Sequence, residues 1–180
     1  RIGPDHVNGV VQVAATADAL KPTAEALAQV RVVARGVVAG AGQERVATPS
    51  FGGHHLAVTV PSEVGIKLAA ETLRIAPGEQ LRFTATIERR GGLQSRIPVE
   101  ALNLPFGLRV LDVGLNGVLI NENETSRSFE VVCDSWAEPG RWPFFAIARI
   151  ESKNERSASN VLELEVVPGG TKTAPTKGAP

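Results

Sequence analysis

Residues 77–88 read Pro-Gly-Glu-Gln-Leu-Arg-Phe-Thr-Ala-Thr-Ile-Glu, and this run decides the fold. The Pro-Gly pair predicts a turn, and the residues after it alternate strictly between apolar and polar. Leu81, Phe83, Ala85 and Ile87 are the apolar members. Because successive side chains of a strand point to opposite faces, the run predicts a strand with one buried face and one solvent-facing face.

Short segments of similar character continue to about residue 168, separated by Gly-, Pro- and Asn-containing turns. Pro98 and Pro105 confine the strand expected at 97–104 to a sheet edge or a strand end. Short strands without a convincing helix predict an all-β fold, an antiparallel two-sheet β-sandwich of seven to nine strands. Residues 56–60 are expected to form a leading strand, and 66–68 and 73–75 are the two parts of a split first strand. The other expected strands are 80–90, 97–104, 108–113, 117–120, 127–133, 141–150 and 159–167.

The first 55 residues are less regular. We expect strands at 10–15, 27–38 and 43–47, and the good helix formers within 23–35 leave a helix there as the alternative. The order of elements in 11–35 echoes that in 129–149. This echo predicts that the chain begins with the last three strands of a preceding copy of the same fold.

The expected domain organisation has four parts. Residues 1–50 are the C-terminal remnant of a preceding similar domain, and 51–60 form a linker and leading strand. Residues 61–168 form the complete sandwich. Residues 169–180 contain Gly, Thr, Lys and Pro without a large apolar side chain, which predicts a disordered tail. A chain that starts at Arg1 and contains no Met is expected to be a piece of a longer protein.

Charge and aromatic content narrow the function classes. Nineteen basic and nineteen acidic residues cancel, which disfavours nucleic acid and anionic membrane surfaces as partners. Six Phe, two Trp and no Tyr leave few aromatic platforms for sugars or single-stranded nucleic acid. No apolar run of 18 residues exists, so this segment is expected not to insert into a membrane.

Few residues suggest chemistry. Cys133 lies in an apolar alternation and is expected to be buried, as free Cys usually is. His54 and His55 have only His6 as a further histidine, too few ligands for a zinc site. Residues 121–124, Asn-Glu-Asn-Glu, could offer oxygen ligands to calcium but are better interpreted as a solvated turn. We expect no metal, no cofactor and no enzymatic activity.

Trp136 is the aromatic residue most suited to a ligand. It lies in a loop, whereas Trp142 shares the strand face of Phe144 and is expected in the core. Trp136, Asn121 and Asn123 are therefore the candidate ligand contacts. Arg89 and Arg90 end a strand before a Gly-Gly turn and are expected to form a solvated tip.

Three turn motifs resemble those of a known family. They are Ala-Pro-Gly-Glu at 76–79, Asn-Leu-Pro-Phe-Gly-Leu at 103–108 and Ala-Glu-Pro-Gly at 137–140. With them the chain resembles the bacterial immunoglobulin-like modules of the NEW3 type, which are associated with galactosidases and large cell-surface proteins. Leu108 replaces the family's usual aromatic residue, and Trp142 stands near the place of its usual Tyr. The resemblance implies an immunoglobulin-like sandwich and covers about residues 9–168.

Residues 45–49, Arg-Val-Ala-Thr-Pro, also resemble tandem C-terminal modules of large exported planctomycete proteins. The two resemblances imply an extracytoplasmic, multi-domain bacterial protein. We expect a non-catalytic spacer or adhesion module whose partners are neighbouring domains, other surface proteins or polysaccharide. The alternative is a carbohydrate-binding accessory module of a secreted glycoside hydrolase or peptidase, with Trp136 and the loop at 121–124 as its contact region.

Overall fold

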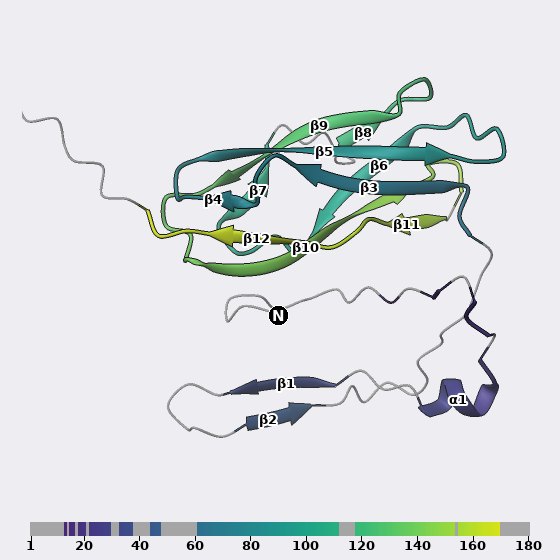
Figure 1. Ribbon diagram of the computed structural model, residues 1–180, viewed down its shortest axis with the longest axis horizontal. Coiled ribbons are helices and arrows are strands. Elements are labelled where there is room, and N and C mark those ends of the chain that lie inside the picture. The colour runs from purple at the N-terminus through teal and green to yellow at the C-terminus, as the bar shows by residue number, and fades with distance from the viewer. Residues whose placement is uncertain are drawn as a thin grey trace, which may run out of the picture. The chain divides into compact units, whose positions relative to one another are not determined.

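The computed structural model describes residues 13, 15–16, 18–20, 22–29, 33–37, 44–47, 61–111, 118–153 and 155–169. The chain divides between residues 61 and 62, so that 13–61 forms one compact unit and the residues from 62 onward belong to another. Figure 1 shows the second unit as two layers of strands. The first unit contains a short helix and a two-stranded sheet.

The unit that starts at residue 62 is an immunoglobulin-like β-sandwich. One sheet has the order β3-β5-β9-β7, and the other has the order β4-β12-β10-β6-β8 with β11 also paired to β10. These orders correspond to the ABED and GFC sheets of an immunoglobulin domain. The strands are β3 (Val64–Ala70), β4 (Arg74–Ile75), β5 (Gln80–Arg89), β6 (Ile97–Leu102), β7 (Leu108–Val110), β8 (Val118–Ile120), β9 (Ser126–Cys133), β10 (Gly140–Arg149), β11 (Arg156–Ala158) and β12 (Leu162–Val166).

The alternating run at 77–88 forms β5, an interior strand of its sheet. It pairs antiparallel with β3 on one side and with β9 on the other. All four predicted inward side chains, Leu81, Phe83, Ala85 and Ile87, are buried. Two sheets can bury a shared core only if each strand has one apolar face, and β5 meets that requirement throughout its length.

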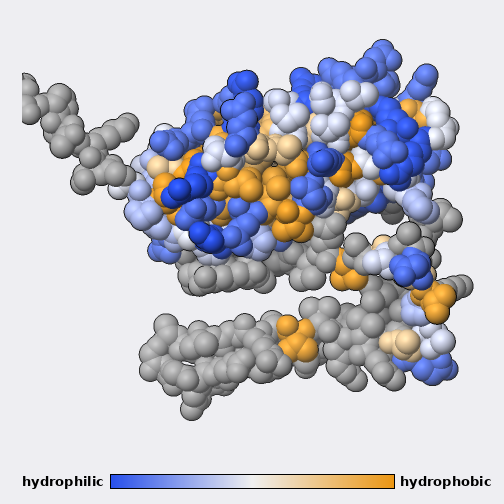
Figure 2. All heavy atoms as spheres, viewed as in Figure 1, coloured by the Kyte–Doolittle hydropathy of each residue, from blue (hydrophilic) through white to orange (hydrophobic). Residues whose placement is uncertain are grey.

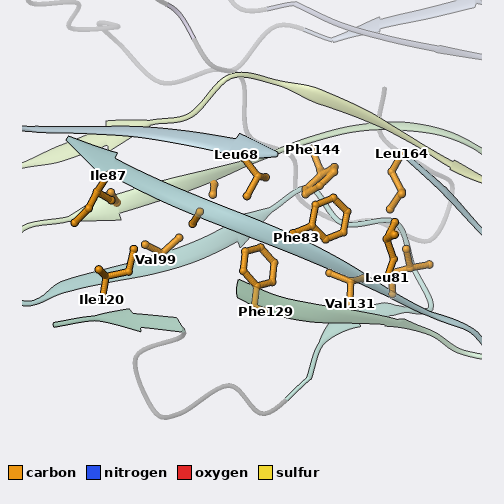
Figure 3. Close-up of a cluster of buried hydrophobic side chains, with 14 of the residues drawn as sticks. Leu68, Leu81, Phe83, Ile87, Val99, Ile120, Phe129, Val131, Phe144 and Leu164 are labelled. Atoms are coloured by element: carbon orange, nitrogen blue, oxygen red, sulfur yellow. The ribbon is translucent and has the colours of Figure 1, made fainter. Parts of the chain in front are cut away.

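Three phenylalanines join the two sheets at the centre of the core. Phe83 of β5 stacks on Phe129 of β9, with ring centroids 5.7 Å apart. Across the sandwich it meets Phe144 of β10 edge to face at 5.0 Å, and Figure 3 shows this contact. Cys133 is fully buried in the same core, as the sequence predicted. Figure 2 shows apolar residues gathered on the middle of one face of the sandwich. Partly buried residues such as Ala70 and Leu162 pack against the core.

The described residues form ten strands in the sandwich, but two pairs of these are single strands that have been split. β3 and β4 divide the first strand between the two sheets, since β4 pairs parallel with β12 whereas β3 pairs with β5. β11 and β12 lie end to end along β10. Counting each pair once gives eight strands, within the predicted range. The sequence did not predict β11, because its three residues contain no large apolar side chain.

Pro98 lies in an interior strand rather than at a sheet edge. β6 has β10 on one side and β8 on the other. Pro98 is opposite Leu119 of β8, whereas the register with β10 begins only at Val99. The proline is therefore tolerated near a strand end, where no ladder hydrogen bond to β10 requires its missing N–H. Of the two predicted alternatives, the edge was wrong and the strand end is confirmed.

A β-bulge at residues 159–161 separates β11 from β12. Three residues of this segment face two residues of β10, because the pair Phe144–Leu162 is followed by the pair Ile147–Ala158. The buried Ser159 side chain takes over one ladder position, since its Oγ accepts a hydrogen bond from the backbone N–H of Ala146 at 2.9 Å. Such a bulge leaves an extra residue that can point elsewhere.

That extra residue is Asn160, which binds the other sheet. Its Oδ1 accepts a hydrogen bond from the Leu68 backbone N–H at 2.9 Å, and its Nδ2 donates one to the Leu68 carbonyl at 3.0 Å. Leu68 belongs to β3, which lies at the edge of its sheet. The carboxamide thus covers part of an exposed strand edge, where unpaired backbone groups would invite another chain to pair.

The first unit is described by α1 (Ala24–Gln29), β1 (Ala34–Val37) and β2 (Glu44–Ala47). The preference for a strand from residue 27 was wrong for the segment up to Gln29, where the helical alternative holds. Thr23 accepts a hydrogen bond from the Ala26 backbone N–H at 3.2 Å and so caps this helix. β1 and β2 pair antiparallel, as expected for strands near 34–37 and 44–47.

Some expectations fall on residues outside the described ranges. These include the leading strand at 56–60, most of the strand expected at 10–15 and the tail at 170–180. They also include the three histidines at positions 6, 54 and 55. That residues 1–50 are the remnant of a preceding copy stays a prediction.

Candidate functional site

Two aromatic side chains that the core does not use lie against each other on the surface. Phe106 and Trp136 are 57% and 55% exposed. Their ring centroids are 4.8 Å apart, with the rings tilted by 57°. They come from different loops, Phe106 between β6 and β7 and Trp136 between β9 and β10. Of the aromatic residues in the described ranges, these two are the exposed ones, and they are in contact.

A tight turn presents Phe106. The Leu108 backbone N–H donates to the Pro105 carbonyl at 3.0 Å, which closes a four-residue turn with Phe106 and Gly107 in the middle. Gly107 has φ +89°, as the third residue of a type II turn requires. A Cβ there would also lie 2.8 Å from the Cβ of Ala137, so glycine alone permits the approach of the second loop.

A second turn presents Trp136 and is bonded to the first. The Ala137 backbone N–H donates to the Asp134 carbonyl at 3.0 Å, and the Asp134 N–H donates to the Gly107 carbonyl at 2.8 Å. Ala137 is buried and anchors the loop. Because backbone bonds hold both turns, the backbone that presents the rings is ordered before any ligand arrives, which lowers the entropy cost of binding.

A pair of charged side chains lies next to the two turns that present the rings. The Arg109 Nε is 3.7 Å from Asp134 Oδ1, and the Arg109 side chain is 60% exposed. Ser135 and Glu138, on either side of Trp136, are exposed. The ion pair is longer than a hydrogen bond, so the guanidinium donors and the carboxylate acceptors can also reach a ligand.

The loop at 121–124 forms a closed turn. The Glu124 backbone N–H donates to the Asn121 carbonyl at 3.1 Å, and the Glu124 carboxylate accepts from the Asn121 N–H at 2.9 Å. This backbone hydrogen bond lowers the pKa of Glu124, and the nearby Arg127 lowers it further. The carboxylate is therefore engaged in the turn. Asn121 is half-buried, and Asn123 is exposed at the tip.

The structure separates the candidate contacts. Asn121 and Asn123 precede β9, whereas Trp136 follows it. The eight residues of β9 span about 26 Å at the usual rise of a strand. Trp136 therefore cannot share one contact region with the loop at 121–124, and the residue beside it is Phe106. Sequence reasoning missed Phe106, although the Pro-Phe-Gly turn that exposes it was visible in the sequence.

Arg89 is not part of a solvated tip, contrary to the expectation. Its side chain donates to the backbone carbonyls of Ser95 and Asn121, each at 2.6 Å. It thereby joins the loop after β5 to the loop before β9. Arg90 is exposed and paired with Glu88 at 2.8 Å, as expected for a solvated residue.

Other residues singled out in the sequence have structural positions. Trp142 is partly buried against the core, as predicted. Burial raises the pKa of the Cys133 thiol, which makes it a poor nucleophile at neutral pH. In the described part of the chain, no three His, Cys, Asp or Glu side chains gather in a way that could hold a metal ion. Within the same ranges, no helix has the length and hydrophobicity of a membrane span.

No family model and no curated protein matches the chain. Solved structures with a similar arrangement include the Yersinia pseudotuberculosis adhesin InvE, at 11% identity and a TM-score of 0.41. The match covers 77% of this chain and spans 49% of the adhesin chain.

Two further structures have comparable similarity. A conjugative transposon lipoprotein from Bacteroides eggerthii is 10% identical, with 59% of this chain and 98% of that chain covered and a TM-score of 0.37. Domains 4 and 5 of the S-layer protein SbsC are 12% identical, with 78% and 67% covered and a TM-score of 0.35. At such identities and scores, these similarities do not indicate a function.

Proposed function

We propose that this chain is a non-catalytic spacer and interaction module of a larger exported protein. The observation that carries the proposal is the placement of the two ends of the sandwich. The chain enters where the Arg90 backbone N–H donates to the Glu63 carbonyl at 2.8 Å, beside the end of β5. It leaves where the Val167 N–H donates to the Ile75 carbonyl at 2.9 Å, just before the turn that starts β5.

We call these ends the N-terminal pole, around Glu63 and Arg90, and the C-terminal pole, around Ile75 and Val167. They are separated by the ten residues of β5, about 33 Å at the usual rise of a strand. A module with its ends at opposite poles adds its full length to a chain of domains. A force that pulls the two ends apart would act parallel to the strands. It would shear the hydrogen bonds between β3 and β5 and those between β4 and β12.

The exported setting rests on the resemblance to NEW3-type and planctomycete modules. In that setting the partners are neighbouring domains of the parent chain, other surface proteins or polysaccharide. The absence of catalysis is part of the proposal. No residue pattern in the sequence suggests a nucleophile with its base, and Cys133, the single thiol, is buried.

Single-molecule pulling on the full chain tests the spacer role. Handles at Arg1 and Pro180 should give one abrupt unfolding event for the sandwich, because many ladder hydrogen bonds must break together. In the control geometry, the handles are attached at Pro61→Cys, before β3, and at Gln94→Cys, after β5, so that both lie at the N-terminal pole. Pulling there separates β3 from β5 one hydrogen bond at a time, and the unfolding force should be clearly lower. Equal forces in the two geometries, or turnover on an ester, peptide or glycoside panel, would contradict the proposal.

A further inference from the structure

We propose that Phe106, Trp136, Arg109 and Asp134 form a binding site for a neutral polysaccharide at the C-terminal pole. This inference rests on the proposed function and names one partner class for the module. It starts from the use of aromatic residues in the described part of the chain. Phe83, Phe129 and Phe144 build the core, Trp142 packs against it, and Phe145 is buried as well. Phe106 and Trp136 remain exposed and meet each other.

The size of the exposed pair favours a small binding unit over a protein partner. A large aromatic side chain can bury 150–250 Å², so two half-exposed rings offer about 200 Å². A stable protein interface needs about 800 Å² on each partner. Ser135 and Glu138, the exposed residues nearest to Trp136 along its loop, are polar. One sugar ring matches this area, because the C–H groups on its face can stack on an aromatic ring.

The chemistry beside the rings also fits a sugar. Neighbouring hydroxyl groups of a sugar each donate and accept hydrogen bonds. Arg109 supplies donors, and Asp134 supplies acceptors 3.7 Å away. A binding site with this ion pair and with Glu138 beside it contains both signs of charge. It has no strong preference for a charged polymer, so the favoured ligand is a neutral polysaccharide.

The rigidity of the site supports binding. The Asp134 N–H to Gly107 carbonyl bond joins the two turns, and the buried Ala137 anchors the second. The two turns do not have to be ordered when the ligand binds, which lowers the entropy cost of binding. The site also lies at the pole where the chain leaves the sandwich, on the end of the module away from the loop at 121–124.

Affinity electrophoresis of the full chain tests this site. The native gels contain hydroxyethyl cellulose, mixed-linkage β-glucan or galactomannan, with carboxymethyl cellulose as a charged comparison. We expect at least one neutral polysaccharide to retard the wild type. Trp136→Ala should weaken the apparent affinity about tenfold or more, as loss of a central aromatic contact does. Phe106→Ala and Arg109→Ala should each weaken it several-fold, and Trp136→Phe should retain most of it.

Arg82→Ala is the matched control, because Arg82 is also exposed and paired with a carboxylate, Glu130, at 2.8 Å. Asn123→Ala is the control at the other pole. Both should bind like the wild type, and thermal melts should show that every variant is folded. The inference is overturned if no neutral polysaccharide retards the wild type, or if Trp136→Ala binds unchanged. A chain that passes the pulling test but is not retarded would lose this inference alone.

Discussion

Single polar residues close the N-terminal pole of the sandwich. Arg89 reaches from the end of β5 to the carbonyls of Ser95 and Asn121, and Glu124 closes the turn that follows Asn121. A hydrogen bond from a charged donor to a backbone carbonyl is stronger than one from a neutral donor. This pair of residues therefore orders two loops that contain little apolar surface.

The first prediction concerns Glu124. Its folded pKa lies below its ordinary value because the carboxylate accepts a hydrogen bond from the Asn121 N–H. The carboxylate therefore contributes stability at pH values above its unfolded pKa, and this contribution is lost as the pH falls through the folded pKa. In an NMR titration of the folded chain, the Glu124 carboxyl should have a midpoint below the ordinary value of a glutamate carboxyl. A midpoint at or above that ordinary value would contradict the turn.

At the scale of elements, β5 shows how one strand serves two environments. Its inward residues join the phenylalanine cluster of the core. Its outward residues make exposed contacts such as Arg82 with Glu130 and Thr84 with Ser128. Burial is worth much more than an exposed ion pair, so substitutions on the two faces should differ sharply.

Phe83→Ala should lower the free energy of unfolding by about 3–5 kcal/mol, because it leaves a cavity between Phe129 and Phe144. Arg82→Ala should leave the free energy of unfolding almost unchanged, because Arg82 lies on the exposed face. Urea unfolding followed by Trp fluorescence measures both values. Similar losses for the two variants would mean that the faces of β5 are wrongly assigned.

The bulge between β11 and β12 supports a second prediction at this scale. Asn160→Ala removes two hydrogen bonds to the Leu68 backbone and should cost about 1–2 kcal/mol. It also uncovers part of the β3 edge, so we expect more self-association at high concentration. Asn123→Ala, at an exposed loop tip, should do neither. Analytical ultracentrifugation measures the self-association apart from the loss of stability. If Asn160→Ala stays fully monomeric at high concentration, Asn160 has no role in protecting the β3 edge.

For the whole molecule, the main feature is a sandwich that has its own core and ends at opposite poles. Among the described residues, those of the hydrophobic core cluster lie in β3 to β12 or in the segments that join them. A domain with its own core should fold alone. The fragment 61–169 should therefore unfold in one cooperative transition in a thermal melt. A fragment that melts without cooperativity would show that residues before 61 belong to the folding unit.

The success of sequence analysis differed between the fold and the site. Buried faces leave a regular apolar pattern in the sequence, and β5, β9, β10 and β12 were predicted close to their observed bounds. β11 and the helix α1 were not, because three small or polar residues carry no periodic signal and a run of Ala and Leu suits a helix or a strand. The candidate contact Trp136 was identified, but its neighbour Phe106 was not.

The sequence by itself therefore determined the sandwich, its buried faces and the buried thiol, because burial requires a pattern that is local in the chain. Tertiary structure alone decided which loops meet. It brought Phe106 to Trp136 through a glycine that leaves room for Ala137, and it took Asn121 and Asn123 to the opposite pole. It also placed the Arg89 side chain on the Asn121 carbonyl and the Asn160 side chain on the backbone of Leu68 in the other sheet. Such contacts join residues that are far apart in sequence, so no local periodicity reports them.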